Sequence, residues 1–355
     1  NMSVKRRDLI HYFEKNGFHL HREGGNHSIY TDDKKVVPVK RHKQLDRITA
    51  NELCKQAGLD PKFYPQVYGS VELEPRGEFV VRSFASFTLS YSAGRYGIDD
   101  SGAIRVSFRM VGDGGRLQIN DPAAPNYVTA GTSCAAKLIL DASPYGISAR
   151  PRNKCLTVRV TGGYLEKGEN ITIVFGDTIQ GSPGLKLQTF AESAFEFKVS
   201  VDPCATGHFV PLAESLEIAI VPDEPAVWKA VLPSLRRPGE DFRFGLKAED
   251  TWGNPTPRAE GRFRLVANLP VEGLPERLDY LQGQKAVNLK KLKVAHEGVL
   301  RIEVLDETGH SVTESNPMVV KAGERAGFWG DLHGQSGESI GVGAAQKYFQ
   351  FARDL

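Results

Sequence analysis

The spacing of hydrophobic residues divides the chain into a short N-terminal head and a long β-type body. In the head, Leu9, Ile10 and Phe13 recur at helical spacing, which predicts an amphipathic helix over Val4–Glu14 that stops at Asn16-Gly17. Three runs typical of strands follow, separated by turn signals: Phe18–Arg22, Ser28–Thr31 and Val36–Val39.

A second helix is expected in the head over Thr49–Ala57. Thr49 is its predicted N-cap, Glu52 stands three residues later as in a capping box, and Gly58 marks its end. The head, residues 1–62, is therefore expected to be an α+β domain with the order α-β-β-β-α.

From residue 67 onward, short β-type runs separated by turn residues replace helical spacing. They predict antiparallel sandwiches in two immunoglobulin-like units, residues 63–225 and 226–322. The runs of the first unit are Phe79–Val81, Phe84–Tyr91, Ala103–Met110, Lys137–Leu140, Leu156–Thr161, Asn170–Phe175, Phe195–Val201 and Leu216–Val221. Those of the second are Phe242–Ala248, Arg262–Val266, Val287–Leu292, Gly298–Leu305 and Met318–Val320, with a tight turn at Asp250–Pro255.

The pattern changes again in residues 323–355. Phe328–Ser336 is expected to be a strand that runs into a polar loop, and a helix is expected from Gly341 to Leu355. Because the helical pattern is incomplete at Leu355, we expect this segment to be the start of a (β/α) domain that continues beyond it.

The composition is that of a folded, turn-rich protein. The 355 residues are 40% hydrophobic, enough for two or three domains with cores, and Gly and Pro together make up about 16%. The sequence contains no apolar run of about 18 residues and no secretory leader, so we expect a soluble cytoplasmic protein with no membrane partner. The four cysteines form no C-x-x-C pair and are expected to be buried free thiols.

The net charge of +2 conceals an uneven distribution. Residues 1–62 hold 13 Lys and Arg against 8 Asp and Glu, together with five of the nine histidines. The rest of the chain is mildly acidic. A basic, His-rich head on an acidic body predicts two unrelated functions in one chain, with nucleic acid as a partner of the head alone.

Five stretches of the head carry a family resemblance: Lys5–Leu9, Glu14–Phe18, Gly24–His27, Val37–Lys43 and Leu53–Leu59. With the α-β-β-β-α order, they resemble the HicA toxin family. The resemblance implies a fold like that of double-stranded-RNA-binding domains, cleavage of mRNA independently of translation, and a HicB-like antitoxin as partner; no DNA partner is expected. The family's key residue is the His of a Gly-Ser-His-like turn, which falls on His27, with Asn26 where Ser is usual.

The chemistry of RNA cleavage suits His27 as a catalytic residue. A metal-independent cut needs a base that takes the proton of the ribose 2′-hydroxyl and an acid that protonates the leaving oxygen, and imidazole titrates near the required pH. We therefore expect no cofactor for the head. Gly24 and Gly25 would let the backbone approach a phosphate. RNA phosphates would be contacted by Lys40, Arg41, His42 and Lys43. Alternatively, this charged run only protects a sheet edge from aggregation.

Separated motifs of the body carry a second resemblance: Gly176–Thr178, Gly181–Gly184, Gln188–Glu192, Glu249–Pro255 and Asp331–Ser336. Over residues 67–355 the chain is similar to the family called domain of unknown function 3604, in which β-sandwich regions precede a PHP-like metallophosphoesterase domain. The resemblance implies His333 as a metal ligand, with Asp331 and Glu338 as candidate oxygen ligands. Gln335 stands where the PHP loop has a second His.

A PHP barrel collects about four to six metal ligands from loops spread over roughly 200 further residues. Zinc or manganese is therefore expected only in a completed PHP-like domain. The main alternative to an RNA-cleaving head is a metal-dependent phosphoesterase whose catalytic domain lies beyond Leu355, with the head either an inert RNA-binding module or a fusion artefact. A third alternative is a body that is purely a binding sandwich.

Overall fold

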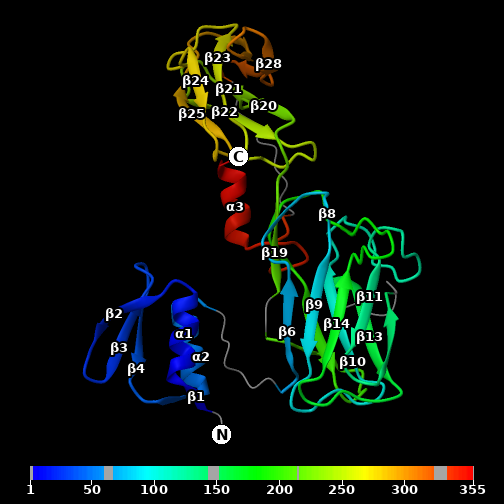
Figure 1. Ribbon diagram of the computed structural model, residues 1–355. Helices are drawn as coiled ribbons and strands as arrows, with labels where there is room; N and C mark the ends of the chain where they lie inside the picture. The colour runs from blue at the N-terminus through cyan, green and yellow to red at the C-terminus, as the bar shows by residue number, and fades with distance from the viewer. Residues whose placement is uncertain (1–2, 60–66, 143–151, 214–215, 324–333, 355) are drawn as a thin grey trace.

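The computed structural model describes residues 3–59, 67–142, 152–213, 216–323 and 334–354. The chain is mainly β, with a small α+β unit at its N-terminus (Figure 1). Its buried hydrophobic residues fall into three separate clusters, within residues 4–57, 71–220 and 230–320. The N-terminal unit, the first β unit and the second β unit therefore each have their own core.

The N-terminal unit is a small sheet with two helices against one face (Figure 1). Its elements are β1 Ser3–Lys5, α1 Arg6–Lys15, β2 His19–Glu23, β3 His27–Thr31, β4 Val36–Lys40, β5 Gln44–Asp46 and α2 Arg47–Ala57. The main sheet is antiparallel with the order β2-β3-β4. Val37 and Val39 of β4 are buried with Leu9 and Phe13 of α1, whereas Lys40 is exposed. Within the described part of the chain, the other face of this sheet stays open.

Helix α1 begins at Arg6, two residues later than expected. Residues 3–5 instead form β1, in which Val4 lies opposite Leu45 of β5. Both side chains are buried in the core. The helical spacing alone predicted that α1 starts at Val4. Pairing and burial of this β-branched residue in a strand outweigh that preference.

The predicted N-cap of α2 was wrong. The cap is Asp46, whose carboxylate accepts the backbone N–H of Thr49 at 2.9 Å, and Thr49 lies inside the first turn. An N-cap residue needs an extended backbone outside the helix, and Asp46, the last residue of β5, has φ −65° and ψ 152°. Glu52 pairs with Lys55 at 2.8 Å instead of closing a capping box. Gly58 ends α2 with a left-handed backbone, as expected.

The first β unit contains fourteen strands in the described residues. They are β6 Ser70–Glu74, β7 Glu78–Val80, β8 Phe84–Ala85, β9 Phe87–Ser92, β10 Ala103–Arg109, β11 Val128–Thr132, β12 Lys137–Asp141, β13 Arg152–Thr161, β14 Asn170–Phe175, β15 Leu185–Lys186, β16 Glu192–Glu196, β17 Lys198–Asp202, β18 Val210–Pro211 and β19 Glu217–Val221.

Two larger sheets of this unit enclose one core, with the orders β12-β13-β10-β17-β18 and β11-β14-β9-β6. Phe108 of β10 meets Phe175 of β14 edge to face, with ring centroids 5.7 Å apart. The aromatic contacts join the two sheets across the core. One pairing departs from the antiparallel expectation, because β7 runs parallel to β19, and strands so distant in the chain can pair in either direction.

The second β unit repeats this mode of packing. Its strands are β20 Val227–Val231, β21 Leu235–Arg236, β22 Phe242–Glu249, β23 Gly261–Ala267, β24 Arg277–Tyr280, β25 Val287–Leu292, β26 Gly298–Leu300, β27 Ile302–Leu305, β28 Ser311–Glu314 and β29 Met318–Val320. They form sheets of order β20-β22-β25, β24-β23-β27-β28 and β21-β29-β26, with β21 and β29 parallel. Trp228 packs against Phe263 and Tyr280 with centroids 4.8 and 4.9 Å away.

The C-terminal helix α3, Ala345–Asp354, begins four residues later than expected. Gly343 has φ +69°, a left-handed conformation that a continuous α-helix does not contain. The helix contacts both β units: the Lys347 amine lies 3.3 Å from the Ser193 hydroxyl, and Arg243 donates to the Arg353 carbonyl at 2.8 Å. None of the helices in the described ranges has the length and apolar content needed to cross a membrane.

The cysteines differ in exposure. Cys54 and Cys155 are buried and Cys134 is half-buried, whereas Cys204 is exposed. The expectation of four buried thiols was therefore wrong for Cys204, which lies in the surface loop that follows β17.

Candidate nucleic-acid interface

His27 is the first residue of β3, and its cross-strand partner is Lys40, the last residue of β4. Directly opposite residues of an antiparallel pair project to the same face, with Cβ atoms about 5 Å apart. The neighbours Ser28 and Val39 are buried on the helix side, so the ring of His27 and the amine of Lys40 lie on the open face. Sequence order separates these two groups by 13 residues, and the register of the sheet brings them together.

Arg41 fastens the turn that leads into His27. Its backbone N–H donates to the Asn26 carbonyl at 3.1 Å, and its guanidinium donates to the Gly24 carbonyl at 3.2 Å. The same guanidinium pairs with the Glu23 carboxylate at 2.8 Å. The Gly24 N–H closes the turn on the His27 carbonyl at 2.8 Å. Four interactions therefore hold the turn that leads into His27.

A second group of contacts holds the same strand ends from the helix side. Arg6 donates to the Ser28 hydroxyl at 2.6 Å and to the Lys40 carbonyl at 3.0 Å. Ser28 in turn donates to Glu23 at 3.3 Å. The sequence did not indicate these roles of Arg6, Ser28 and Glu23. Successive residues of a strand project to opposite faces, so Ser28 next to His27 could have been predicted as a polar residue buried on the helix side.

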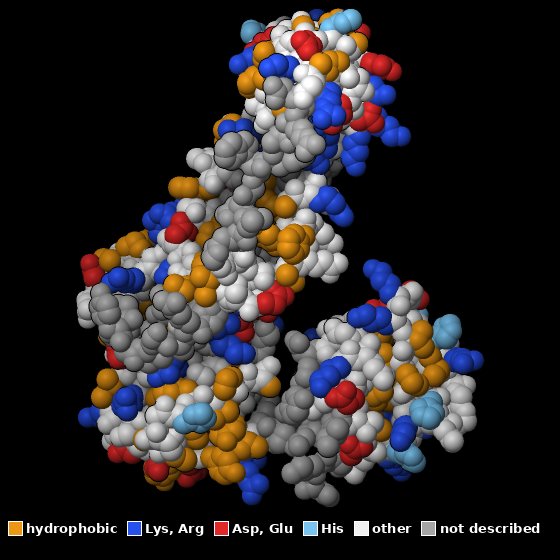
Figure 2. All heavy atoms as spheres, turned by 180° about the vertical axis from the view of Figure 1, so that it is seen from behind, with side chains coloured by type: hydrophobic (Ala, Val, Ile, Leu, Met, Phe, Trp, Pro, Cys, Tyr) orange, Lys and Arg blue, Asp and Glu red, His pale blue; other side chains and the backbone are white. Residues whose placement is uncertain are grey.

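The candidate RNA-binding cations fall into two classes. Lys40, His42 and Lys43 are exposed, and their side chains have no hydrogen bond or ion pair with any residue that the structure describes. Arg41 is also exposed, but its guanidinium is engaged within the turn. Figure 2 shows His, Lys and Arg side chains distributed over the surface of the N-terminal unit. Lys40 is the free cation that flanks His27 directly.

The two glycines of the turn differ in their surroundings. Neither Gly24 nor Gly25 has a positive φ, so the backbone conformation itself does not demand glycine. A Cβ at Gly24 would lie 3.2 Å from the His27 carbonyl oxygen, whereas a Cβ at Gly25 would meet no atom within 4 Å. The backbone at Gly25 is therefore open to an approaching ligand.

Tyr30 belongs to the core of the unit. Its side chain is 5% exposed and packs 6.3 Å from the ring of Phe13. Burial raises the pKa of the Tyr30 hydroxyl, although the nearby guanidinium of Arg6 acts in the opposite direction. Tyr30 therefore serves packing and stays neutral at physiological pH.

The candidate metal ligands lie at the other end of the chain. His333 and Asp331 fall outside the described residues. Glu338 is exposed, and its carboxylate accepts the Ser336 hydroxyl and, at 3.4 Å, the Ala345 N–H. The bond from Ser336 is the main cause that lowers the pKa of Glu338. The described residues contain no group of three or more His, Cys, Asp or Glu side chains arranged to hold a metal ion.

Comparisons with known proteins bear on the N-terminal unit. Residues 6–59, from the start of α1 to just past α2, match the family described as HicA toxin of bacterial toxin-antitoxin. A search of curated proteins found no match to the chain. Solved structures similar to the chain include the adhesin InvE of Yersinia pseudotuberculosis, at 8% identity over 72% of this chain and 59% of that chain with a TM-score of 0.22. A marsupial T cell receptor matches at 8% identity over 72% of each chain with a TM-score of 0.23.

This chain thus spans 59% of the length of the adhesin chain. TM-scores at this level support no conclusion about the fold of the β units. The family match, in contrast, covers α1, the sheet, the turn before His27 and α2 together. The match therefore supports a HicA-like domain at residues 6–59, within the N-terminal unit.

Proposed function

We propose that the N-terminal unit is an endoribonuclease that cleaves mRNA without a metal, with His27 as a proton-transferring residue. The observation that carries this proposal is the placement of His27 opposite Lys40 on the open face of the sheet, at a turn fastened by Arg41. The match of residues 6–59 to HicA toxins supports the same class of activity.

The reaction follows from the ribose itself. The 2′-oxygen loses its proton to a base and attacks the adjacent phosphorus, and the bond from phosphorus to the 5′-oxygen breaks as that oxygen takes up a proton. The products end in a 2′,3′-cyclic phosphate and a 5′-hydroxyl. His27 serves one of these two proton transfers, and the ammonium of Lys40 stabilises the charge on the phosphate.

A HicB-like antitoxin is the protein partner of this proposal. Because His27 lies on an open sheet face, an antitoxin would stop cleavage by covering that face or by binding the exposed cations Lys40, His42 and Lys43. With mRNA as substrate, the activity belongs to the cytoplasm.

The test compares His27→Ala with His11→Ala in the purified full chain. His11 is an exposed histidine on α1 with no partner among the described residues, so it controls for loss of an imidazole from the same unit. With EDTA present and a synthetic mRNA as substrate, His27→Ala should lower the cleavage rate by roughly 10²–10⁴-fold. His11→Ala should leave the rate and the cyclic-phosphate ends unchanged.

Cleavage by His27→Ala at the wild-type rate would remove His27 from the mechanism. Loss of wild-type cleavage on adding EDTA would contradict the metal-independent reaction. Circular dichroism at 222 nm reports whether α1 and α2 remain folded in each variant, so that a folding defect is distinguished from a catalytic one.

A further inference from the structure

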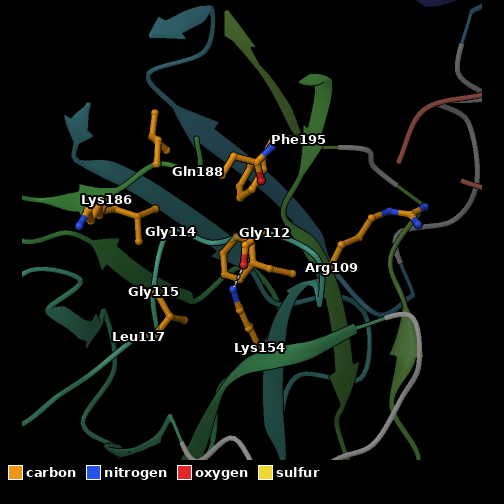
Figure 3. A pocket seen from close by; sticks show the side chains of 12 residues that line it. Arg109, Gly112, Gly114, Gly115, Leu117, Lys154, Lys186, Gln188 and Phe195 are labelled. Atoms are coloured by element: carbon orange, nitrogen blue, oxygen red, sulfur yellow. Dashed lines mark hydrogen bonds between the residues drawn. The ribbon is translucent and has the colours of Figure 1, made fainter. Parts of the chain in front are cut away.

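A small cavity lies in the first β unit, near the end of β10 (Figure 3). Its volume is about 40 Å³, and its walls are mainly the apolar side chains Phe108, Leu117, Leu185, Leu187 and Phe195. A cavity measured in this way needs about 10–15 Å³ for each water, so it has room for roughly three waters or for a ligand of a few heavy atoms.

Lys154 of β13 places an ammonium group in this apolar wall. Its amine donates to the Gly112 carbonyl, the contact drawn as a dashed line in Figure 3. An ammonium has three N–H donors, and this is its one hydrogen bond to the described residues. Desolvation by burial lowers the pKa of Lys154, the negative charge of Asp113 opposes that effect, and the positive charge of Arg116 adds to it.

No carboxylate of the described chain neutralises Lys154 by direct contact. Asp113, whose negative charge acts on Lys154, instead accepts the backbone N–H and the hydroxyl of Thr189 at 2.8 and 2.7 Å and lies 3.8 Å from the guanidinium of Arg82. A half-buried cation without an anion is costly, and an anionic ligand would relieve that cost.

The other polar side chains around the cavity are directed elsewhere. Lys186 and Arg109 project away from it in Figure 3, and Arg109 donates to the carbonyls of Gly341 and Gly337 in the C-terminal segment. The amide of Gln188 donates to the Phe190 carbonyl and to Glu192. Of the three cationic residues that line the cavity, Lys154 is therefore the one whose charge faces its apolar wall.

We propose that this cavity binds a short-chain aliphatic carboxylate, with the carboxylate on the ammonium of Lys154 and the alkyl group against Phe108 and Phe195. The site is independent of the ribonuclease proposed for the N-terminal unit. A volume of about 40 Å³ leaves no room for a long acyl chain, and the apolar wall disfavours inorganic phosphate, which has no alkyl group to bury.

The experiment measures binding of propionate to the full chain by saturation-transfer NMR and by titration calorimetry at near-neutral pH. A ligand of this size is expected to bind with a Kd on the order of 1 mM. Propanol and propylammonium have the same alkyl group without the anion, and phosphate is an anion without the alkyl group. All three should bind at least tenfold more weakly than propionate.

Lys154→Met should weaken propionate binding by about tenfold or more, because a charged hydrogen bond is lost. Lys186→Met is the matched control, since it removes a lysine that lines the cavity but points away from it. If Lys154→Met does not fold, Lys154→Gln keeps a donor for Gly112 and removes the charge. Failure of propionate to bind the wild-type chain, or equal binding to Lys154→Met or Lys154→Gln and wild type, would overturn the proposal.

Discussion

Lys40 and Arg41 are adjacent in the chain, yet the contacts of their side chains differ. The amine of Lys40, opposite His27, has no hydrogen bond or ion pair with the described residues, whereas the guanidinium of Arg41 contacts the Gly24 carbonyl and the Glu23 carboxylate. Composition could only group them as two cations of one basic run. For the proposed ribonuclease, we therefore expect Lys40 to bind phosphate and Arg41 to hold the turn in position.

Substitutions at these two positions should therefore have different kinetic signatures in RNA cleavage. Lys40→Ala should raise KM, and it should reduce the slope of log affinity against log salt concentration by about 0.7 because one phosphate contact is lost. Arg41→Ala should lower kcat with little change in KM, because the exposed pair with Glu23 contributes only about 0–1 kcal/mol to stability but keeps the His27 turn in place.

Arg41→Lys separates geometry from charge. A lysine keeps the positive charge but has no planar fork to reach both Gly24 and Glu23. If Arg41 positions the turn, Arg41→Lys should resemble Arg41→Ala in kcat. Wild-type kinetics for Arg41→Lys would instead assign Arg41 to simple electrostatic attraction of RNA.

At the scale of elements, the sequence predicted most strands of the body but not where they change partners. Phe84–Tyr91, Phe195–Val201 and Gly298–Leu305 were each expected to be one strand. Each is broken at a single residue, Ser86, Phe197 or Arg301, and the two halves pair with different strands. Hydrophobic residues continue on both sides of each break, so the change of sheet leaves no mark in the hydrophobic pattern of the sequence.

The candidate site shows the same limit. His27 and the basic run Lys40–Lys43 could be singled out from residue types and from the HicA resemblance. Their juxtaposition depends on the register of β3 and β4, which turn length and long-range packing set together. The same holds for Arg41, because a guanidinium that reaches back to Gly24 cannot be distinguished from a free one by its place in the sequence.

The cap of α2 gives a prediction at this scale. Asp46→Ala should destabilise the N-terminal unit by about 1 kcal/mol, because the Thr49 N–H loses its acceptor at 2.9 Å. Thr49→Val is the control: it removes the hydroxyl that donates to Asp46 but leaves the capping bond. Urea unfolding followed by circular dichroism at 222 nm measures both. If Thr49→Val lowers the free energy of unfolding more than Asp46→Ala does, Thr49 and not Asp46 is the N-cap.

At the scale of the whole molecule, the turn Asp250–Pro255 does more than reverse the chain within the second β unit. Asn254, which is 8% exposed, accepts the Ala191 N–H at 2.8 Å and donates to the Thr189 carbonyl at 2.8 Å in the first β unit. Beside it, the guanidinium of Arg82 lies 5.5 Å from the centre of the Trp252 ring. These contacts couple the two β units, and the sequence indicated only a tight turn.

Asp250 makes this junction sensitive to acid. Burial alone would raise the pKa of its carboxyl, but the hydrogen bonds that it accepts from Asp223, Asn254 and Trp252 outweigh that effect and hold the pKa below its ordinary value. A depressed carboxyl pKa stabilises the fold above the unfolded-state pKa of about 3.9, and that contribution is lost as pH falls through the lower, folded-state value. Trp252 fluorescence should therefore report loosening of the junction below about pH 4 in the wild type.

Asn254→Ala should uncouple the two β units in calorimetric unfolding of the full chain. The variant removes two part-buried hydrogen bonds at the point where the units meet, each worth about 0.5–1.5 kcal/mol. Asn316→Ala is the matched control, because Asn316 makes the same pair of bonds to the backbone of Leu232 inside the second unit. We expect Asn254→Ala to broaden or split the transition of the β units, and Asn316→Ala to lower the stability of the second unit without affecting the contacts between units. If the two variants give the same thermogram, Asn254 stabilises only its own turn and the units are coupled elsewhere.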